Sequence, residues 1–318
     1  MYIVSLFLFP LFSQAFFKIP NLSYALYNYR IQQISNSTMT QLHKIQTFTE
    51  MTRAPTHFLP ISLLSVATVS NTIPPSTPLL TTSITNPHFQ VSFVMVQLLS
   101  WLSMVINDIW DVESDRINHP HRPLVTGRIS MRDVQRFSLA ISALYIFLGI
   151  RFLPQLAHIW TFSFVTICAY TPILKKICVI KNVACASVIS AAVPFIGLSV
   201  SLSQRNDFGL WRLAHFTFLW SMFLELMMDI LDKRGDANAG IPTVPVLYGN
   251  TVTIDAMCSL LFLSQLYFIR VHPPSAWIHF VFYYFLWRIE ETGFDRKEIN
   301  NACKHITYGL LCIAFVLR

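Results

Sequence analysis

The sequence predicts an all-α membrane protein, built as a bundle of nine transmembrane helices. Hydrophobic side chains make up 53% of the 318 residues and charged ones only 12%, about half the charged share of soluble domains. The mean hydropathy is +0.50, and apolar runs alternate with short polar loops along most of the chain. These observations indicate one multi-pass bundle in a lipid bilayer, without a sizeable soluble domain.

The first 57 residues differ from the rest. They begin with the apolar run "MYIVSLFLFPLFSQAFF" and continue with a stretch that is rich in Ser, Thr and Gln and contains a single acid, Glu50. We interpret residues 1–57 as an N-terminal leader that serves as a targeting or anchor segment, and we assign no fold to its polar part, residues 18–57. Residues 58–318 then form the transmembrane domain.

Apolar segments of helical length follow one another from residue 58 onward. A stretch rich in Pro and Thr, residues 71–87, predicts a connector after the first of them. Ser130 followed by Asp133 is typical of a helix N-cap and predicts where the third helix begins. The predicted helices are 58–72, 89–109, 133–152, 156–174, 183–202, 210–231, 251–270, 275–290 and 303–317.

Lys and Arg are distributed unevenly between the loops. The loops after the second, fourth, sixth and eighth helices hold fourteen of them, whereas the alternating loops hold four: Arg151, Arg205, Arg212 and Arg270. This bias recurs from loop to loop along the chain and predicts that the even-numbered loops face the cytoplasm or an organelle matrix. The membrane itself, whether of the endoplasmic reticulum, a mitochondrion or a plastid, is left open.

Composition also argues against other classes of protein. The formal net charge is +7, but the positive residues lie in short loops between apolar runs, a pattern of membrane topology rather than of nucleic-acid binding. The six cysteines include no pair with CxxC spacing and mostly lie in or beside apolar runs. Neither a zinc site nor a disulfide framework is indicated.

Two acidic clusters with the same spacing stand out in this acid-poor chain. The segment "NDIWDVESD" ends the second predicted helix and contains Asp108, Asp111 and Asp115. The segment "DILDKRGD" ends the sixth helix and repeats the spacing D-x-x-D-x-x-x-D with Asp229, Asp232 and Asp236.

Helical geometry gathers each cluster on one face. At about 100° per residue, the three aspartates of each set fall within a narrow arc, whereas Glu113 falls on the far side of its helix. The two helix ends are separated by an even number of spans and therefore emerge on the same side of the membrane. Two carboxylate stripes can then face each other across the bundle.

Several carboxylates close to a bilayer are costly unless cations neutralise them. Mg²⁺ prefers oxygen ligands and typically binds one or two carboxylates together with substrate phosphate oxygens. Arg122, Lys175 and Lys176 lie in loops of the same side and are suitable partners for phosphate. We therefore predict a Mg²⁺-dependent diphosphate site; solvated loop acids and a cation pathway remain the other interpretations of the two clusters.

At these residues the chain resembles the UbiA superfamily of intramembrane prenyltransferases. "NDIWDVESD" matches the first family motif at Asn107, Asp108, Asp111 and Asp115, and "RPLVTGRIS" matches the following segment at Arg122. "DILDKRGDANAGIPTVPVLYG" matches the second motif. "YTPILKK" resembles the family's tyrosine and basic segment at Tyr170, Lys175 and Lys176. The resemblance covers residues 58–318.

The resemblance implies nine helices around a central cavity, in which an isoprenyl diphosphate binds through Mg²⁺ to both motifs. Departure of the diphosphate produces an allylic carbocation, which a lipophilic acceptor then attacks. The implied metal-binding and catalytic residues are Asp108, Asp111, Asp115, Asp229, Asp232 and Asp236, with Asn107 as a further ligand or phosphate contact. The implied diphosphate-binding residues are Asn107, Arg122, Lys175, Lys176 and Tyr170.

Three questions stay open at the level of sequence. A branch of the same family cyclises the isoprenoid itself, so a terpene cyclase is an alternative, as is a non-catalytic lipid or cation carrier that keeps the fold. Glu225, before the second motif, can serve packing or catalysis. Tyr170, Trp110, Phe223 and Trp220 can line the cavity, but plain packing between helices is the more frequent role for any one of them.

Overall fold

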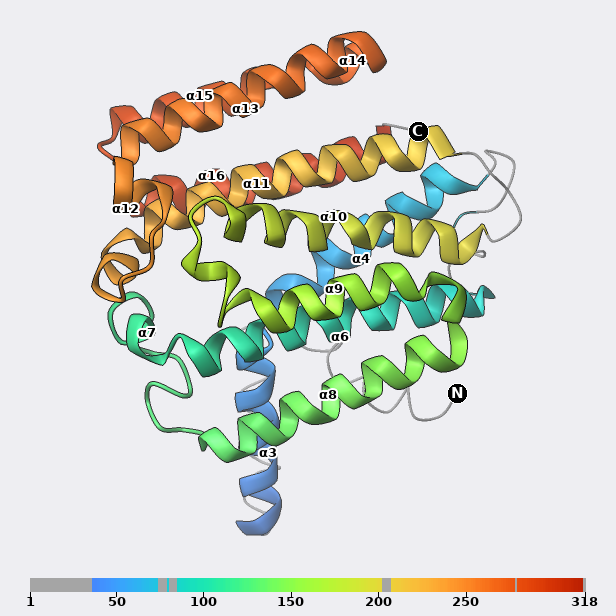
Figure 1. Ribbon diagram of the computed structural model, residues 1–318, viewed down its shortest axis with the longest axis vertical. Helices are drawn as coiled ribbons and strands as arrows, with labels where there is room; N and C mark the ends of the chain where they lie inside the picture. The colour runs from blue at the N-terminus through green and yellow to red at the C-terminus, as the bar shows by residue number, and fades with distance from the viewer. Residues whose placement is uncertain (1–35, 74–78, 80–84, 202–206, 278, 317–318) are drawn as a thin grey trace, which may run out of the picture.

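A computed structural model describes residues 36–73, 79, 85–201, 207–277 and 279–316 of the protein. Every regular element within these ranges is helical, as the composition predicts. The long helices lie side by side in layers, and the two ends of the bundle carry the connections (Figure 1). The predicted targeting run at the N-terminus lies outside the described residues, as does most of the connector between residues 71 and 87.

The first half of the bundle consists of the helices up to residue 200. Its members, in chain order, are α3 (Asn36–Met51), α4 (Ala54–Thr72), α6 (Pro87–Trp110), α7 (Val112–Asn118), α8 (Met131–Phe152), η1 (Pro154–Leu156), α9 (Ala157–Tyr170), η2 (Leu174–Lys176) and α10 (Ile180–Val200). Residues from α6, α8, α9 and α10 share one apolar core around Tyr145 and Trp160.

The second half is built around α11 (Asp207–Asn238). The remaining helices are α12 (Val244–Tyr248), α13 (Asn250–Val271), α14 (Pro273–Ala276), α15 (His279–Glu291) and α16 (Arg296–Val316). Their apolar faces meet α11 in a second core, which includes Trp220, Phe268 and Phe282. Helix α10 packs against α11 and joins the two halves.

Local sequence signals explain where several helices begin. The side chain of Asn86 accepts hydrogen bonds from the backbone N–H groups of His88 (2.9 Å) and Phe89 (3.1 Å), which fixes the start of α6. Ser130 accepts one from Asp133 at 3.1 Å, so the predicted N-cap of α8 is confirmed. Such caps satisfy backbone donors that have no partner within the helix.

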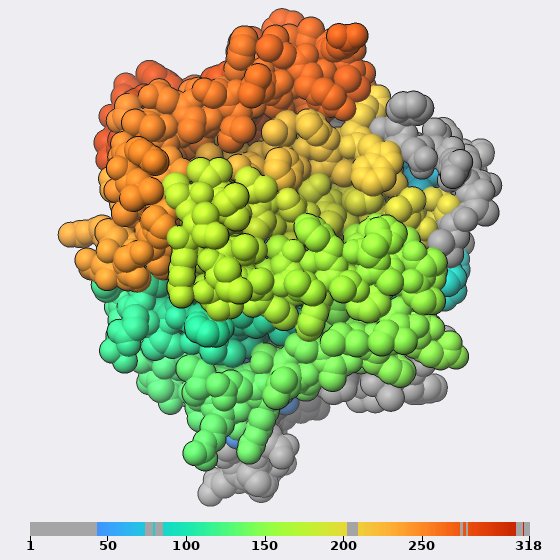
Figure 2. Space-filling view, in the orientation of Figure 1, coloured from blue at the N-terminus to red at the C-terminus, as the bar shows by residue number. Residues whose placement is uncertain are grey.

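The outer faces of the bundle are apolar, as a bilayer requires. Large side chains stand exposed on α8 and α9, the green helices of Figure 2, among them Leu139 at 69%, Phe147 at 58% and Val165 at 56%. An exposed apolar surface of this extent is typical of contact with lipid. The protein is thus an integral membrane protein.

The predicted count of nine spans is not confirmed. Within the described residues, five helices are long and apolar enough to cross a membrane: α6, α8, α10, α11 from Gly209, and α13. Each of the other predicted ranges overlaps a helix, but α9 has 14 residues and α15 has 13, fewer than the roughly 20 that a perpendicular crossing needs. Helices α4 and α16 are longer but carry more polar side chains.

One end of the bundle gathers the residues that matter below. The junction of α6 with α7, the connection from α9 to α10, the C-terminal end of α11, and α12 all lie at this end (Figure 1). The sequence places the Lys- and Arg-rich loops here, so basic side chains surround the two acidic clusters.

Candidate functional site

The first acidic cluster lies where α6 gives way to α7. The chain leaves α-helical geometry at Asp111 (φ −95°, ψ 10°), but the backbone hydrogen bonds continue from Asp111 to Asn107 (2.9 Å) and from Asp115 to Asp111 (2.8 Å). Asp108, Asp111 and Asp115 are therefore still gathered on one face, and each is at most 6% exposed. Glu113 points away, with its side chain 80% exposed, as the helical spacing predicts.

Basic side chains from three separate segments neutralise this cluster. Arg53, just before α4, contacts Asp108 at 2.9 Å. Arg122 contacts Asp108 at 3.2 Å and also pairs with Asp115. Lys175 reaches Asp111 at 2.5 Å. Burial raises the pKa of the Asp115 carboxyl above its ordinary value, and the guanidinium of Arg122 opposes that shift.

The second cluster lies in the last turns of α11. Asp229 is 4% exposed; it pairs with Lys181 and accepts a hydrogen bond from the amide of Asn182 at 2.9 Å. Asp236 is 5% exposed, and the charges of Lys175 and Lys181 act on it. Asp232 is more open and faces His119 at 3.5 Å. The second stripe is thus also lined with cations.

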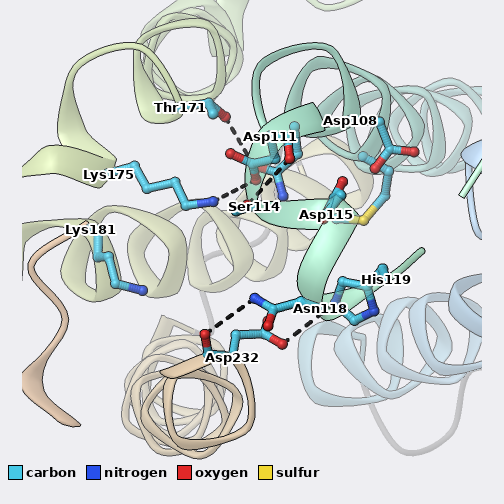
Figure 3. A network of polar contacts seen from close by, with 12 residues as sticks. Asp108, Asp111, Ser114, Asp115, Asn118, His119, Thr171, Lys175, Lys181 and Asp232 are labelled. Atoms are coloured by element: carbon cyan, nitrogen blue, oxygen red, sulfur yellow. Dashed lines mark hydrogen bonds and ion pairs between the residues drawn. The ribbon is translucent and has the colours of Figure 1, made fainter. Parts of the chain in front are cut away.

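Asn118 joins the two clusters directly (Figure 3). Its Nδ2 donates to the backbone oxygen of Asp232 at 3.2 Å, and its Oδ1 accepts from the backbone N–H of Gly235 at 3.2 Å. The last residue of α7 therefore docks α7 onto α11 through main-chain atoms of the second motif. This contact links the two segments that carry the predicted stripes.

The predicted diphosphate-binding residues are only partly assembled around these clusters. Arg122 and Lys175 lie among the carboxylates, and Tyr170 is close enough to interact electrostatically with Asp111 and Asp229. The side-chain oxygen of Asn107 accepts a hydrogen bond from Thr171 at 3.1 Å. Lys176 is exposed and makes no ion pair among the described residues. Of the two neighbouring lysines, it is therefore Lys175 that contacts the site.

Sequence reasoning missed several polar residues of the site. Lys181 falls in the predicted loop between residues 174 and 183, but it lies in the first turn of α10 and is 3% exposed beside Asp229. Arg53 falls in the predicted leader, residues 1–57, yet it contacts Asp108. A Lys-Asn pair at the start of an otherwise apolar helix was the available signal for Lys181. For Arg53 the local sequence offers no comparable signal, because its partner lies 55 positions further along the chain.

Three of the four aromatic residues that can line the cavity lie away from the carboxylates. Trp110 is 59% exposed on the outside of α6. Trp220 and Phe223 point into the core between α11 and α15, where their rings lie 4.6 Å and 5.6 Å from that of Phe282. Only Tyr170 remains near the carboxylates. The reason is that α11 packs on both sides, so its aromatic residues serve the core with α15 and not the face with the acids.

Glu225 lies one turn before Asp229 on α11. Its carboxylate accepts a hydrogen bond from the thiol of Cys185 at 3.0 Å, and the charge of Lys181 acts on it. Glu225 is therefore part of the same polar region, deeper in the bundle than the aspartates. Its partner is a side chain of α10, so it also contributes to the packing of α10 on α11.

The residues present fit Mg²⁺ by their chemistry. Among the described residues, no three His, Cys, Asp or Glu side chains lie close enough together to hold a metal ion by themselves. Mg²⁺ does not need such a set, because it commonly takes one or two carboxylates and completes its shell with water and phosphate oxygens. One buried oxygen without a hydrogen bond, Oδ1 of Asn182 beside Asp229, leaves ligand capacity next to the second stripe.

Comparison with known proteins identifies the family of this chain. The model of the UbiA prenyltransferase family matches residues 59–299. The chain belongs to this family. A digeranylgeranylglyceryl phosphate synthase of Sulfolobus acidocaldarius is 31% identical over 172 residues, which are 52% of this chain and 60% of that protein. The chain spans about half to three fifths of the length of the first curated relatives that it matches.

Solved structures of UbiA-type proteins share the fold. A structure of a digeranylgeranylglyceryl phosphate synthase superposes with a TM-score of 0.59 at 20% identity, covering 86% of this chain and 97% of that one. A UbiA homolog from Archaeoglobus fulgidus bound to GPP and Mg²⁺ gives a TM-score of 0.63 at 18% identity, covering 85% and 99%. At these identities the likeness concerns the fold alone.

Proposed function

We propose that this protein is a Mg²⁺-dependent intramembrane prenyltransferase that ionises an isoprenyl diphosphate and transfers the prenyl group to a lipophilic acceptor. One observation carries the proposal. Two carboxylate stripes of identical spacing, of whose six aspartates five are buried, lie at one end of an apolar bundle, linked through Asn118 and paired with cationic side chains from other segments.

Each group of residues has a role in this proposal. Asp108, Asp111, Asp115, Asp229, Asp232 and Asp236, with Asn107, would hold Mg²⁺ directly or through water. When bound, Mg²⁺ supplies positive charge that stabilises the leaving diphosphate. Arg122, Lys175 and Lys181 would bind phosphate oxygens, and Lys176 would contribute from the surface. Fixed cations that gain interaction as the C–O bond breaks lower the barrier more than they strengthen ground-state binding.

The apolar bundle serves the other half of the reaction. A long prenyl chain leaves water when it lies between the helices, and exclusion of water protects an allylic carbocation from hydrolysis. Tyr170 is the aromatic side chain closest to the acids and would contact the head of the substrate. Only the relatives bear on the class of acceptor. Their name designates synthesis of a glyceryl phosphate lipid, which favours transfer to a lipid over cyclisation.

The test is diphosphate release by the purified protein in lipid nanodiscs. Geranyl, farnesyl and geranylgeranyl diphosphates are supplied with Mg²⁺, each with and without a panel of lipid-alcohol and aromatic acceptors. We expect acceptor-dependent release, and a loss of at least about a hundredfold for Asp111→Ala and for Asp229→Ala. Glu113→Ala, which alters an exposed acid on the opposite face of the same segment, is the matched control and should retain activity.

Three outcomes would decide against the proposal. Cyclic hydrocarbon products in the absence of any acceptor would establish a terpene cyclase instead. No diphosphate release from any substrate would favour a non-catalytic carrier. Full activity of both aspartate variants would remove the carboxylate stripes from the mechanism altogether.

A further inference from the structure

A groove separate from the acidic clusters opens between α10, α11 and α13. It has a volume of about 770 Å³, and five of its lining residues carry the argument: Trp211, Arg212, His215, Phe218 and Tyr267. In Figure 1, α11 and α13 are further apart at the end away from α12, and the groove lies toward that end. Arg212 and Asp229 both lie on α11, roughly 26 Å apart along its axis at about 1.5 Å per residue.

Arg212 is the unusual residue of this groove. Its Nε is buried and has no hydrogen bond, and within the part of the chain that the structure describes the guanidinium forms no ion pair. Its Nη2 lies 3.9 Å from the position of a Cβ added to Gly209, so the side chain extends toward the start of α11. An unpaired cation at the end of a membrane helix is costly unless it reaches water or an anion at the interface.

The walls of the groove are aromatic and apolar. Trp211 is 53% exposed beside Arg212, and the rings of His215 and Tyr267 lie 4.6 Å apart. Trp211, Arg212, His215 and Phe218 follow one another at spacings of one, three and three residues, so at about 100° per residue they share one side of α11. Aromatic side chains next to Arg are characteristic of the lipid headgroup region. The groove thus combines one cationic centre with surface for hydrocarbon chains.

We propose that this groove binds an anionic membrane phospholipid, with the lipid phosphate on Arg212 and an acyl chain along Phe218 and Tyr267. A single guanidinium matches the single negative charge of a phosphodiester. An isoprenyl diphosphate carries more charge and would need several cations or metal ions, which the groove does not provide among the described residues. The site is also distinct from the diphosphate site by its position on α11, so it does not depend on the proposed reaction.

The first experiment measures lipid binding by native mass spectrometry of the detergent-solubilised protein. Phosphatidylglycerol and phosphatidylcholine of the same chain length are titrated against the wild type, Arg212→Gln and Arg151→Gln. Arg151 is an exposed arginine near the C-terminal end of α8, outside the groove, and serves as the matched control. We expect Arg212→Gln to weaken phosphatidylglycerol binding about ten- to a hundredfold, as the loss of a hydrogen bond to a charged group implies, while Arg151→Gln binds like the wild type.

A second experiment uses folded protein without altering Arg212. Phosphatidylglycerol with brominated acyl chains quenches nearby tryptophan fluorescence, so the quenching lost in Trp211→Phe reports occupancy of the groove. The proposal is overturned if phosphatidylcholine binds as tightly, if Arg212→Gln and Arg151→Gln lose affinity equally, or if Trp211 contributes nothing to the quenching. Displacement of the brominated lipid by geranylgeranyl diphosphate at equal affinity would identify a substrate channel and overturn it as well.

Discussion

The contact between Asn118 and Gly235 makes a quantitative prediction about how the two acidic clusters are held together. A Cβ added at Gly235 would lie 2.6 Å from Oδ1 of Asn118 and still closer to its Cγ and Nδ2. Atoms that are not bonded to each other do not approach this closely, so Gly235→Ala must displace the Asn118 side chain. Both of its hydrogen bonds, to the backbone of Asp232 and from that of Gly235, are then lost.

The expected free energies follow from these contacts. Two hydrogen bonds contribute about 1 kcal/mol each, whereas Ala is favoured over Gly inside a helix by about 1 kcal/mol. Gly235→Ala should therefore lower the stability by about 1 kcal/mol in the wild type. In an Asn118→Ala background there is no clash and no hydrogen bond to lose, so Gly235→Ala should raise the stability by about 1 kcal/mol. The two substitutions therefore have a coupling free energy of about 2 kcal/mol.

The assay is a double-mutant cycle on thermal unfolding in one detergent, repeated for diphosphate release. Gly309→Ala is the matched control, because Gly309 is also inside a helix and has nothing within 4 Å of an added Cβ; it should be neutral or stabilising. We expect Gly235→Ala to reduce turnover more than its loss of stability explains, since the distance between the carboxylate stripes changes. Additivity of the two substitutions within about 0.5 kcal/mol would refute the reasoning.

Three further predictions concern other parts of the molecule. Lys181→Ala leaves the buried Asp229 without its ion pair and should lower diphosphate release by about two orders of magnitude. The control variant Arg116→Ala, at an exposed position of α7, should not lower it. Equal effects of the two substitutions would argue against a specific role of Lys181. Chelation of Mg²⁺ should abolish turnover and added Mg²⁺ should restore it in an activity assay, and turnover that survives chelation would contradict the proposed use of the aspartates. In Gly149→Ala the new Cβ would lie 2.8–3.1 Å from the ring of Trp160, so unfolding measurements should show that the free energy of unfolding falls by about 1–3 kcal/mol. An unchanged melting temperature would mean that α8 and α9 move apart freely to accommodate the methyl group.

The parts of the site that were predictable from sequence are those with local periodicity. Asp108, Asp111 and Asp115 are related by helical spacing alone, and the small change of backbone at Asp111 leaves their common face intact. The exposure of Glu113 follows from the same geometry. For such residues, position along one helix determines which side they face.

The partners of the aspartates were harder to foresee, because each comes from a distant segment. Arg53 meets Asp108 only after α4 has packed beside α6, and Lys181 meets Asp229 only through the contact of α10 with α11. The predicted number of membrane spans is not confirmed either. Hydropathy locates apolar segments well, but it does not fix whether a short helix such as α9 crosses the bilayer completely.

The placement of Arg53 has a practical consequence for shortened forms of the protein. The family match begins at residue 59, and a truncation chosen at that border would appear safe. It would remove one of the two guanidinium groups that contact Asp108. It would also remove α3, whose Glu50 accepts two hydrogen bonds from Arg128, at 2.7 Å and 2.6 Å, in the loop that carries Arg122. A recombinant version meant for enzymology should therefore start no later than Asn36.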